Sequence, residues 1–363
     1  MEKVTYRNAL LSVKPVNGEY YTKAKERLDS LVKPLGSLGR LEEIAAKLSS
    51  ITGTLTPCID KRCILVFAAD NGVYAEGVAS APQAVTAIQT INILNGATGV
   101  GVLAKRFNTD IIVADVGVDA DLSHERLINM KVRKSTGNIV KEPAMTKDEA
   151  EKAIDAGIKL VGMAKKDGYQ AIGTGEMGIG NTTTSSAVLS ALLGLSGSEI
   201  DRVVGRGAGL SDINFENKKR IIKEALRFHS PDQKDPVDIL QKAGGLDLAA
   251  LTGVYIGAAY YGLPVVIDGF ISAVAALCAA RLSPTVKDYM FASHSSYEIG
   301  YRAAIDALGF SACLDLEMRL GEGSGCPIMF SVMDGALEIL KNMATFDEAM
   351  IDNLYVSQIG LSF

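Results

Sequence analysis

The sequence predicts an α/β fold, in which a parallel sheet is flanked by helices on both faces. Short apolar runs alternate with helical patterns through the middle of the chain, as in parallel sheets. Each apolar run ends in Asp, Gly, Ser or Glu, where such sheets carry their binding groups. The two ends, about 1–55 and 326–363, lack this strand pattern. We therefore expect a large α/β catalytic domain over 56–325 and a small helical domain formed from both ends.

The composition is that of an ordinary globular protein. Of the 363 residues, 48% are hydrophobic and 22% are charged. The net charge of -5 and the scattered basic residues argue against a nucleic-acid partner. The number of cysteines is 5, which is odd, and no C-x-x-C pair occurs, so zinc ribbons and disulfide frameworks are disfavoured. The first ten residues contain no apolar signal segment, and we expect a cytoplasmic protein.

Helices are expected first. Residues 21–52 have a helical pattern, with apolar side chains from Leu41 to Leu48 at helical spacing, and the pattern stops at Gly53. The segment 33–39 contains Pro and Gly and predicts a rigid turn before the apolar repeat that begins at Leu41.

The first two strands are expected at 63–69 and 110–116, with a helix at about 82–94 between them. The first run is apolar throughout and ends in the polar turn 70–72, as expected of a buried parallel strand whose carboxyl end faces a site.

Three further strands follow a long helix at about 146–166. They are expected at 171–173, at 265–267 and around 289–292. An Ala/Ser-rich helix is expected after the glycine-rich segment that follows the first of these strands.

One uncharged stretch has the length of a membrane span. It is twenty residues long, from Leu248 to Ile267, and it contains three Gly and Pro264 and is followed by Asp268. A buried helix, a turn and a buried strand explain this pattern better than a membrane span does.

The strongest local motif is the glycine-rich segment Gly173–Thr184. A strand runs into several glycines, including Gly178 and Gly180, and Asn181 and Thr182 then open a helix. Glycines let the backbone approach an anion, and the first helical N–H groups can hold it. The segment is neither a Walker loop nor a dinucleotide fingerprint. The alternatives are a phosphate site at 178–183 or a plain glycine turn with a Thr cap.

A second glycine segment includes Gly207 and is followed by a basic run that contains Lys218. Lys218 could supply a charge to the same phosphate, or the run could be a solvated helix face.

The third motif, Arg319–Gly325, surrounds Glu322 with glycines on a predicted loop. The glycines leave room for a ligand beside the acid, although an incidental surface turn would look the same. The three histidines show no metal-ligand spacing.

These motifs, in this order, resemble the nicotinate-nucleotide:dimethylbenzimidazole phosphoribosyltransferase family. The resemblance spans about 33–325, and its ordered motifs together are far more specific than any one of them. The matching stretches are Lys33–Glu42, Ala69–Gly72, Gly175–Thr183, Gly244–Leu248, Asp268–Phe270, Ser293–His294 and Arg319–Gly325.

The resemblance implies a homodimer with a small helical domain from both termini. It also implies a reaction that moves phosphoribose from nicotinate mononucleotide to 5,6-dimethylbenzimidazole. The products are nicotinate and α-ribazole 5′-phosphate, a step in assembling the nucleotide loop of cobalamin, without a metal or a cofactor.

By motif, the family's general base falls on Glu322, and Gln89 matches a residue beside the base pocket. Ala81 stands where the family commonly has a polar or aromatic residue, which leaves the acceptor open between dimethylbenzimidazole, other benzimidazoles and phenols. The substrate-binding residues expected around the donor are Glu176, Gly178, Gly180, Asn181, Thr182, Gly207, Lys218 and Ser296.

Two other functions compete with this one. A non-catalytic nucleotide-binding subunit would suit the fold, but the intact Gly-Glu-Gly loop argues against it. A nicotinamide dehydrogenase is disfavoured because no Gly-x-Gly-x-x-Gly follows the first strand.

Overall fold

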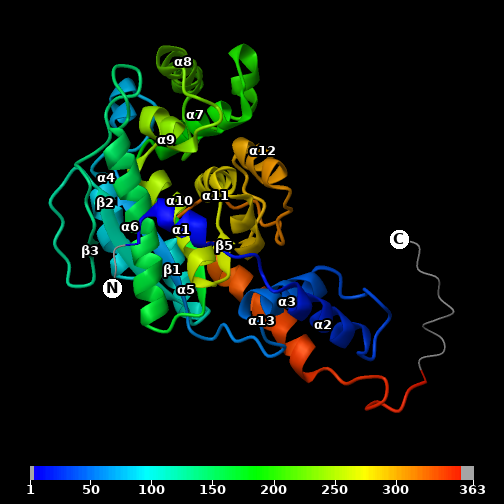
Figure 1. Cartoon of the computed structure of the whole chain (residues 1–363). Helices are drawn as coiled ribbons and strands as arrows, with labels where there is room; N and C mark the ends of the chain where they lie inside the picture. Colours follow the sequence, from blue (N-terminus) through cyan, green and yellow to red (C-terminus); the bar gives the residue numbers. More distant parts are fainter. Residues whose placement is uncertain (1–3, 353–363) are drawn as a thin grey trace. The chain divides into compact units, whose positions relative to one another are not determined.

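The computed structural model describes residues 4–352. The chain separates into two compact units (Figure 1). Of the described residues, the large unit contains 4–14 and Lys61–Met329, and the small unit contains Pro15–Asp60 and 330–352. Helix α1 (Tyr6–Ser12) belongs to the large unit, where the Tyr6 backbone N–H donates to the Asp155 carboxylate at 2.7 Å. The domain boundaries expected at 55/56 and 325/326 remain a prediction.

The large unit is built on one sheet of six parallel strands in the order β3-β2-β1-β4-β5-β6. The α/β class and the parallel sheet predicted from the sequence are confirmed. The strands are β1 (Arg62–Ala69), β2 (Asp110–Gly117), β3 (Ile128–Asn129), β4 (Ala171–Met177), β5 (Val265–Ile267) and β6 (Met290–Ala292).

Strand β4 is longer than the sequence pattern indicates. We expected it to end at Gly173, but it continues to Met177 because Thr174–Glu176 pair with Leu65–Phe67 of β1. The two residues of β3 and the helix α5 (Gly99–Arg106) were not predicted.

Helices cover the sheet. They include α4 (Val85–Leu94), α6 (Lys147–Lys166), α7 (Asn181–Leu193), α8 (Asp212–His229), α9 (Pro236–Ala243), α10 (Leu246–Tyr261), α11 (Phe270–Leu282) and α12 (Ile299–Leu308). Buried α10 contacts β1, β2 and β4, and the Tyr255 hydroxyl lies 3.0 Å from that of Thr174. The uncharged stretch 248–267 therefore folds as predicted. It forms α10 from that helix's third residue onward, then a turn, then β5.

A different apolar stretch, Val85–Arg106, has the length and composition of a membrane span, and 39% of its most apolar window of 18 residues is buried. The structure divides it into α4, of 10 residues, and α5, of 8 residues. Each helix is too short to cross a bilayer.

The two faces of β4 admit different neighbours, because side chains alternate along a strand. Thr174 faces α10, so Gly173 and Gly175 face the other way. A Cβ on Gly175 would lie 2.4 Å from the Glu322 carbonyl oxygen. These glycines therefore let the loop 321–325 lie directly on the sheet.

The small unit contains α2 (Gly18–Asp29), α3 (Arg40–Thr52) and the part of α13 (Cys326–Asn342) from Phe330 onward. The predicted turn at 33–39 separates α2 from α3, and the helical pattern ends at Gly53, which caps α3 in the left-handed conformation. The buried Lys33 and Glu42 side chains form an ion pair of 2.8 Å across this turn.

Candidate active site

A cavity of about 290 Å³ opens beyond the carboxyl ends of the strands in the large unit. Strands β1 and β4 are neighbours there, and the sheet order runs outward from them in opposite directions. Crevices at such a point are the usual ligand sites of open α/β sheets. The residues that line the cavity fall within five ranges of the sequence, namely 78–89, 176–182, 206–210, 268–272 and 296–322.

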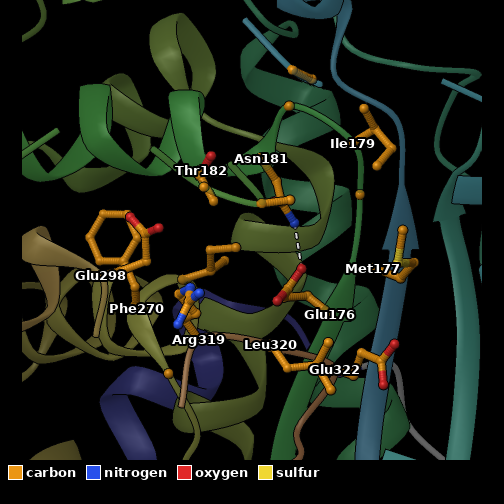
Figure 2. Close-up of a pocket in the computed structure, with 18 of the residues that line it drawn as sticks. Glu176, Met177, Ile179, Asn181, Thr182, Phe270, Glu298, Arg319, Leu320 and Glu322 are labelled. Carbon is orange, nitrogen blue, oxygen red and sulfur yellow. Dashed lines mark hydrogen bonds between the residues drawn. The ribbon is translucent and has the colours of Figure 1, made fainter. Parts of the chain in front are cut away.

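The glycine-rich segment lies on the cavity wall as predicted. Gly178, Gly180, Asn181 and Thr182 all line it, and Gly180 enters α7 with a φ of 92° (Figure 2). A Cβ on Gly178 would lie 2.4 Å from the Ala69 carbonyl oxygen, so only glycine lets the chain leave β4 this close to the end of β1. The first turn of a 13-residue helix therefore faces the cavity, which suits an anion.

Lys218 lies behind this wall. The side chain is fully buried on α8, and it is absent from the cavity lining. Its Nζ donates to the Thr182 hydroxyl at 2.8 Å and to the Gly205 carbonyl at 3.0 Å. Burial lowers the pKa of Lys218 to about 8. Lys218 therefore contacts the cavity only indirectly, through the hydrogen bond to Thr182, which lines it. Gly207 lies beside Thr182 and also lines the cavity.

A chain of buried polar groups lies in the middle of the cavity wall. The Asn181 amide donates one hydrogen bond to Glu176 at 2.5 Å and another to Asp247 at 3.0 Å (Figure 2 shows the first). Burial raises the pKa of Glu176 to about 8, with a further contribution from Asp247. Burial also raises the pKa of Asp247 to about 6. At neutral pH Glu176 is therefore mostly protonated.

Glu322 lies on the opposite face of β4 from α10, with a side chain only 4% exposed. One carboxylate oxygen accepts a hydrogen bond from the Gln89 side chain at 2.9 Å. The other accepts one from the Val100 backbone N–H, in the first turn of α5, at 3.2 Å. The structure thus brings together Glu322 and Gln89, which lie far apart in the sequence.

The remaining predicted residues also lie on the cavity wall. Ser296 follows β6, and Ala81 lies in the loop before α4. Of the predicted site residues, Lys218 alone does not line the cavity.

Several lining residues were assigned no role from the sequence. Asp268 follows β5 and its carboxyl group is buried, and Glu298 and Arg319 lie toward the Thr182 end of the cavity (Figure 2). The position of Asp268 at a strand end was visible in the sequence. Glu298 lies in no motif of the sequence, and Arg319 begins the motif around Glu322, whose loop conformation brings it to the cavity.

His294 is not part of the lining. Its ring is buried, its Nδ1 lies 3.0 Å from the Ser293 hydroxyl, and burial lowers its pKa to about 4. Within residues 4–352, no group of three or more His, Cys, Asp or Glu side chains is arranged to hold a metal ion.

Comparison with known proteins identifies the family. A family model described as phosphoribosyltransferase matches residues 13–351. The chain is 55% identical over 350 residues to a nicotinate-nucleotide–dimethylbenzimidazole phosphoribosyltransferase of Clostridium perfringens, with 96% of each chain covered. It is 51% identical to an enzyme of that name from Ruminiclostridium cellulolyticum, with 96% of this chain and 98% of the relative covered.

A solved structure agrees with this assignment. The crystal structure of nicotinate-nucleotide–dimethylbenzimidazole phosphoribosyltransferase from Thermus thermophilus superposes with a TM-score of 0.87. The sequences are 38% identical, with 93% of this chain and 99% of that chain covered. The fold, the cavity at the sheet edge and these similarities together place the chain in the phosphoribosyltransferase family to which these enzymes belong.

Proposed function

We propose that this chain transfers phosphoribose from nicotinate mononucleotide to 5,6-dimethylbenzimidazole, with Glu322 as the general base. The products are nicotinate and α-ribazole 5′-phosphate, which serves the nucleotide loop of cobalamin. The names of relatives that match along nearly the whole chain support the substrates and the reaction. The motifs of this family support the assignment of the base.

The observation that carries the proposal is the position of the Glu322 carboxyl group. It is buried at the cavity wall, and the two groups that donate to it, the Gln89 amide and the Val100 N–H, are both neutral. No cation therefore competes with an incoming N–H group for the carboxylate at these contacts. A carboxylate held in this way can accept a proton from a bound azole.

The reaction balances with Glu322 as the one proton acceptor. One ring nitrogen of the benzimidazole attacks C1′ of the ribose, and the bond between C1′ and the nicotinate nitrogen breaks. Its electron pair leaves with nicotinate. The proton on the other benzimidazole nitrogen passes to Glu322. The change from a β-nucleotide to an α-product requires attack on the face opposite the leaving group, so holding both reactants in line should contribute much of the acceleration.

We assign the donor phosphate to the first turn of α7. Gly178, Gly180, Asn181 and Thr182 would hold it there, since glycines and helical N–H groups face the cavity at this point. Lys218, Gly207 and Ser296 would complete this subsite, and Glu176 would contact the donor beside Asn181.

We assign the acceptor to the part of the cavity near Glu322, between Gln89 and Ala81. The small Ala81 side chain lines the cavity and leaves space beside the acceptor. This observation supports a second candidate reaction, with a phenol or another benzimidazole as the acceptor and the same donor. A phenol would attack through oxygen, and Glu322 would take the O–H proton.

Replacement of Glu322 by Gln tests the function. Gln preserves the shape but cannot accept the proton, so turnover with dimethylbenzimidazole should fall about 10²–10⁴-fold. Donor affinity, measured by titration calorimetry, should stay nearly constant. With an acceptor that is already ionised at the assay pH, the turnover of this variant should fall less. Turnover measured with a panel of benzimidazoles and phenols identifies the preferred acceptor. Full turnover by the Gln variant would move the base elsewhere, and Glu176 would be the next carboxyl group to test. A non-catalytic subunit would show no turnover even in the unsubstituted chain.

We also propose that the enzyme is a cytoplasmic homodimer. The exposed apolar side chains of Ile88 on α4 and Val102 on α5, which are 59% and 62% exposed, support a protein contact on these helices. Light scattering at micromolar concentration should report twice the mass of the chain. A monomer at that concentration would contradict the proposal.

A further inference from the structure

The loop that carries Glu322 has an unusual backbone. Gly321, Glu322 and Gly323 have consecutive φ values of 81°, 63° and 91°. Glycine adopts this left-handed region freely, whereas a residue with a Cβ rarely does. Glu322 therefore needs contacts from outside the loop to keep this conformation.

Asp268 supplies such contacts. It directly follows β5, is only 2% exposed, and points its carboxylate at the loop. One carboxylate oxygen accepts the Gly323 N–H at 3.1 Å, and the other accepts the Gly325 N–H at 2.7 Å. Both oxygens thus accept hydrogen bonds from the loop that follows Glu322, at Gly323 and Gly325.

Close packing limits where else the loop could lie. A Cβ on Gly325 would be 2.1 Å from the His294 ring, and a Cβ on Gly323 would be 2.6 Å from the Ile64 side chain. Asp268 and His294 follow neighbouring strands, β5 and β6. The sheet edge therefore sets the position of the loop.

We propose that Asp268 is a positioning residue for the phosphoribosyl transfer, and that it holds the backbone of loop 321–325 so that Glu322 reaches the acceptor proton. This inference rests on the proposed function, because it takes Glu322 as the general base. Asp268 needs both carboxylate oxygens for this role. An asparagine would place an NH₂ group against one of the two N–H donors and repel it.

The first measurement compares Asp268→Asn with the unsubstituted enzyme. Misplacement of a catalytic group by about 1 Å can cost about 10²-fold in rate, so kcat should fall by about that factor. KM for nicotinate mononucleotide should change little, because the donor subsite lies on α7 and not on this loop. Circular dichroism and donor calorimetry show whether the variant is folded.

The deciding measurement repeats the substitution in a Glu322→Gln background. If Asp268 acts only through Glu322, its substitution should have little effect once Glu322 has been replaced. The further fall in kcat should therefore be less than about 3-fold. Gly325→Ala is a second variant that displaces the same loop through His294, and it should show the same dependence on Glu322.

Asp247→Asn is the matched control. Asp247 is an equally buried carboxyl group in the same unit, but it contacts Asn181 and the donor side. Its loss should raise KM for the donor, and this effect should persist in the Glu322→Gln background.

The outcomes separate the two proposals. Full turnover by Glu322→Gln alone would overturn the assignment of the base, and with it the role of Asp268. A large loss for Glu322→Gln combined with an equally large additional loss for Asp268→Asn would leave the base in place and overturn the positioning role. Unchanged kcat in both Asp268→Asn and Gly325→Ala would also overturn the positioning role.

Discussion

At the scale of single residues, the site works through pairs that are distant in the sequence. Asn181 uses its side-chain amide on Glu176 and on Asp247, 66 positions away. The sequence indicated Asn181 through its place at the start of a helix, but no local signal could connect it with Asp247. The same is true of Glu322 and Gln89, whose separation is 233 residues. Motifs predicted most of the side chains that line the cavity, and the fold decides which of them are in contact.

The buried Lys218 yields a prediction at this scale. Replacing it with Met keeps the apolar stem and removes the charge that acts on the proposed phosphate subsite through Thr182. Loss of a hydrogen bond to a charged group costs about 1.5–3 kcal/mol, so donor affinity should fall about 10–100-fold in titration calorimetry. Lys219→Met, at the next position on α8, where the side chain pairs with Glu216, is the control and should bind normally. Equal affinities for the two variants would remove Lys218 from the donor site.

The same residue makes donor binding depend on pH. Burial lowers the pKa of Lys218 to about 8, so it loses its charge as the pH rises through that value. KM for the donor should increase between pH 7 and pH 9 in the unsubstituted enzyme. The Lys218→Met variant should lack this part of the increase.

At the scale of elements, the contact between α6 and α10 depends on glycines. A Cβ on Gly157 would lie 1.9 Å from the Ala250 carbonyl oxygen, and one on Gly253 would lie 1.9 Å from that of Ile154. These two helices therefore approach backbone to backbone. The sequence pattern predicted both helices, α6 as a long helix at about 146–166 and α10 as an uncharged buried helix, but it could not show that they cross at these glycines.

Gly253→Ala should consequently destabilise the protein. The added methyl group must push α10 away from α6, and overpacking of this kind typically costs about 1–3 kcal/mol. Gly335→Ala, in α13, is the control because nothing lies within 4 Å of its added Cβ. That change should be neutral or stabilising by about 0.5–1 kcal/mol. Urea denaturation of both variants measures the difference, and equal midpoints would contradict the close crossing.

At the scale of the whole molecule, buried carboxyl groups at and beside the cavity should make the free energy of unfolding fall as the pH becomes alkaline. Burial raises the pKa of Glu176 to about 8, of Asp268 to about 7 and of Asp247 to about 6. A carboxyl group with a raised pKa in the folded protein contributes stability that is complete below its unfolded pKa and is lost as the pH rises through its folded pKa. The loss from Glu176 therefore continues up to about pH 8.

The free energy of unfolding of the ligand-free enzyme should thus decrease between pH 6.5 and pH 8, by on the order of 1 kcal/mol. Lys218 acts in the opposite direction only above its pKa of about 8. Glu176→Gln cannot ionise, so it should flatten the decrease in this window. Chemical denaturation at several pH values checks this, and a parallel decrease in the variant would exclude Glu176 as the cause.

The sequence was most informative where burial and backbone chemistry leave a local pattern. The apolar runs placed five of the strands, and the glycines around Gly178 and Glu322 marked two walls of the cavity. The two-residue strand β3 escaped prediction because so short a segment has no periodicity. Glu298, which lines the cavity, escaped because it lies in no local motif, and Arg319 lies in the motif around Glu322 but was not assigned to the site.

The left-handed backbone at Glu322 has a consequence for how this protein evolves. The left-handed conformation costs a glutamate about 1–2 kcal/mol more than it costs a glycine. A glycine would relieve this strain, but it would leave the Gln89 amide and the Val100 N–H without the carboxylate that accepts their hydrogen bonds. In a laboratory screen for heat tolerance that does not assay catalysis, glycine is therefore the replacement at position 322 that the backbone tolerates best, and any survivor that carries it is expected to be inactive.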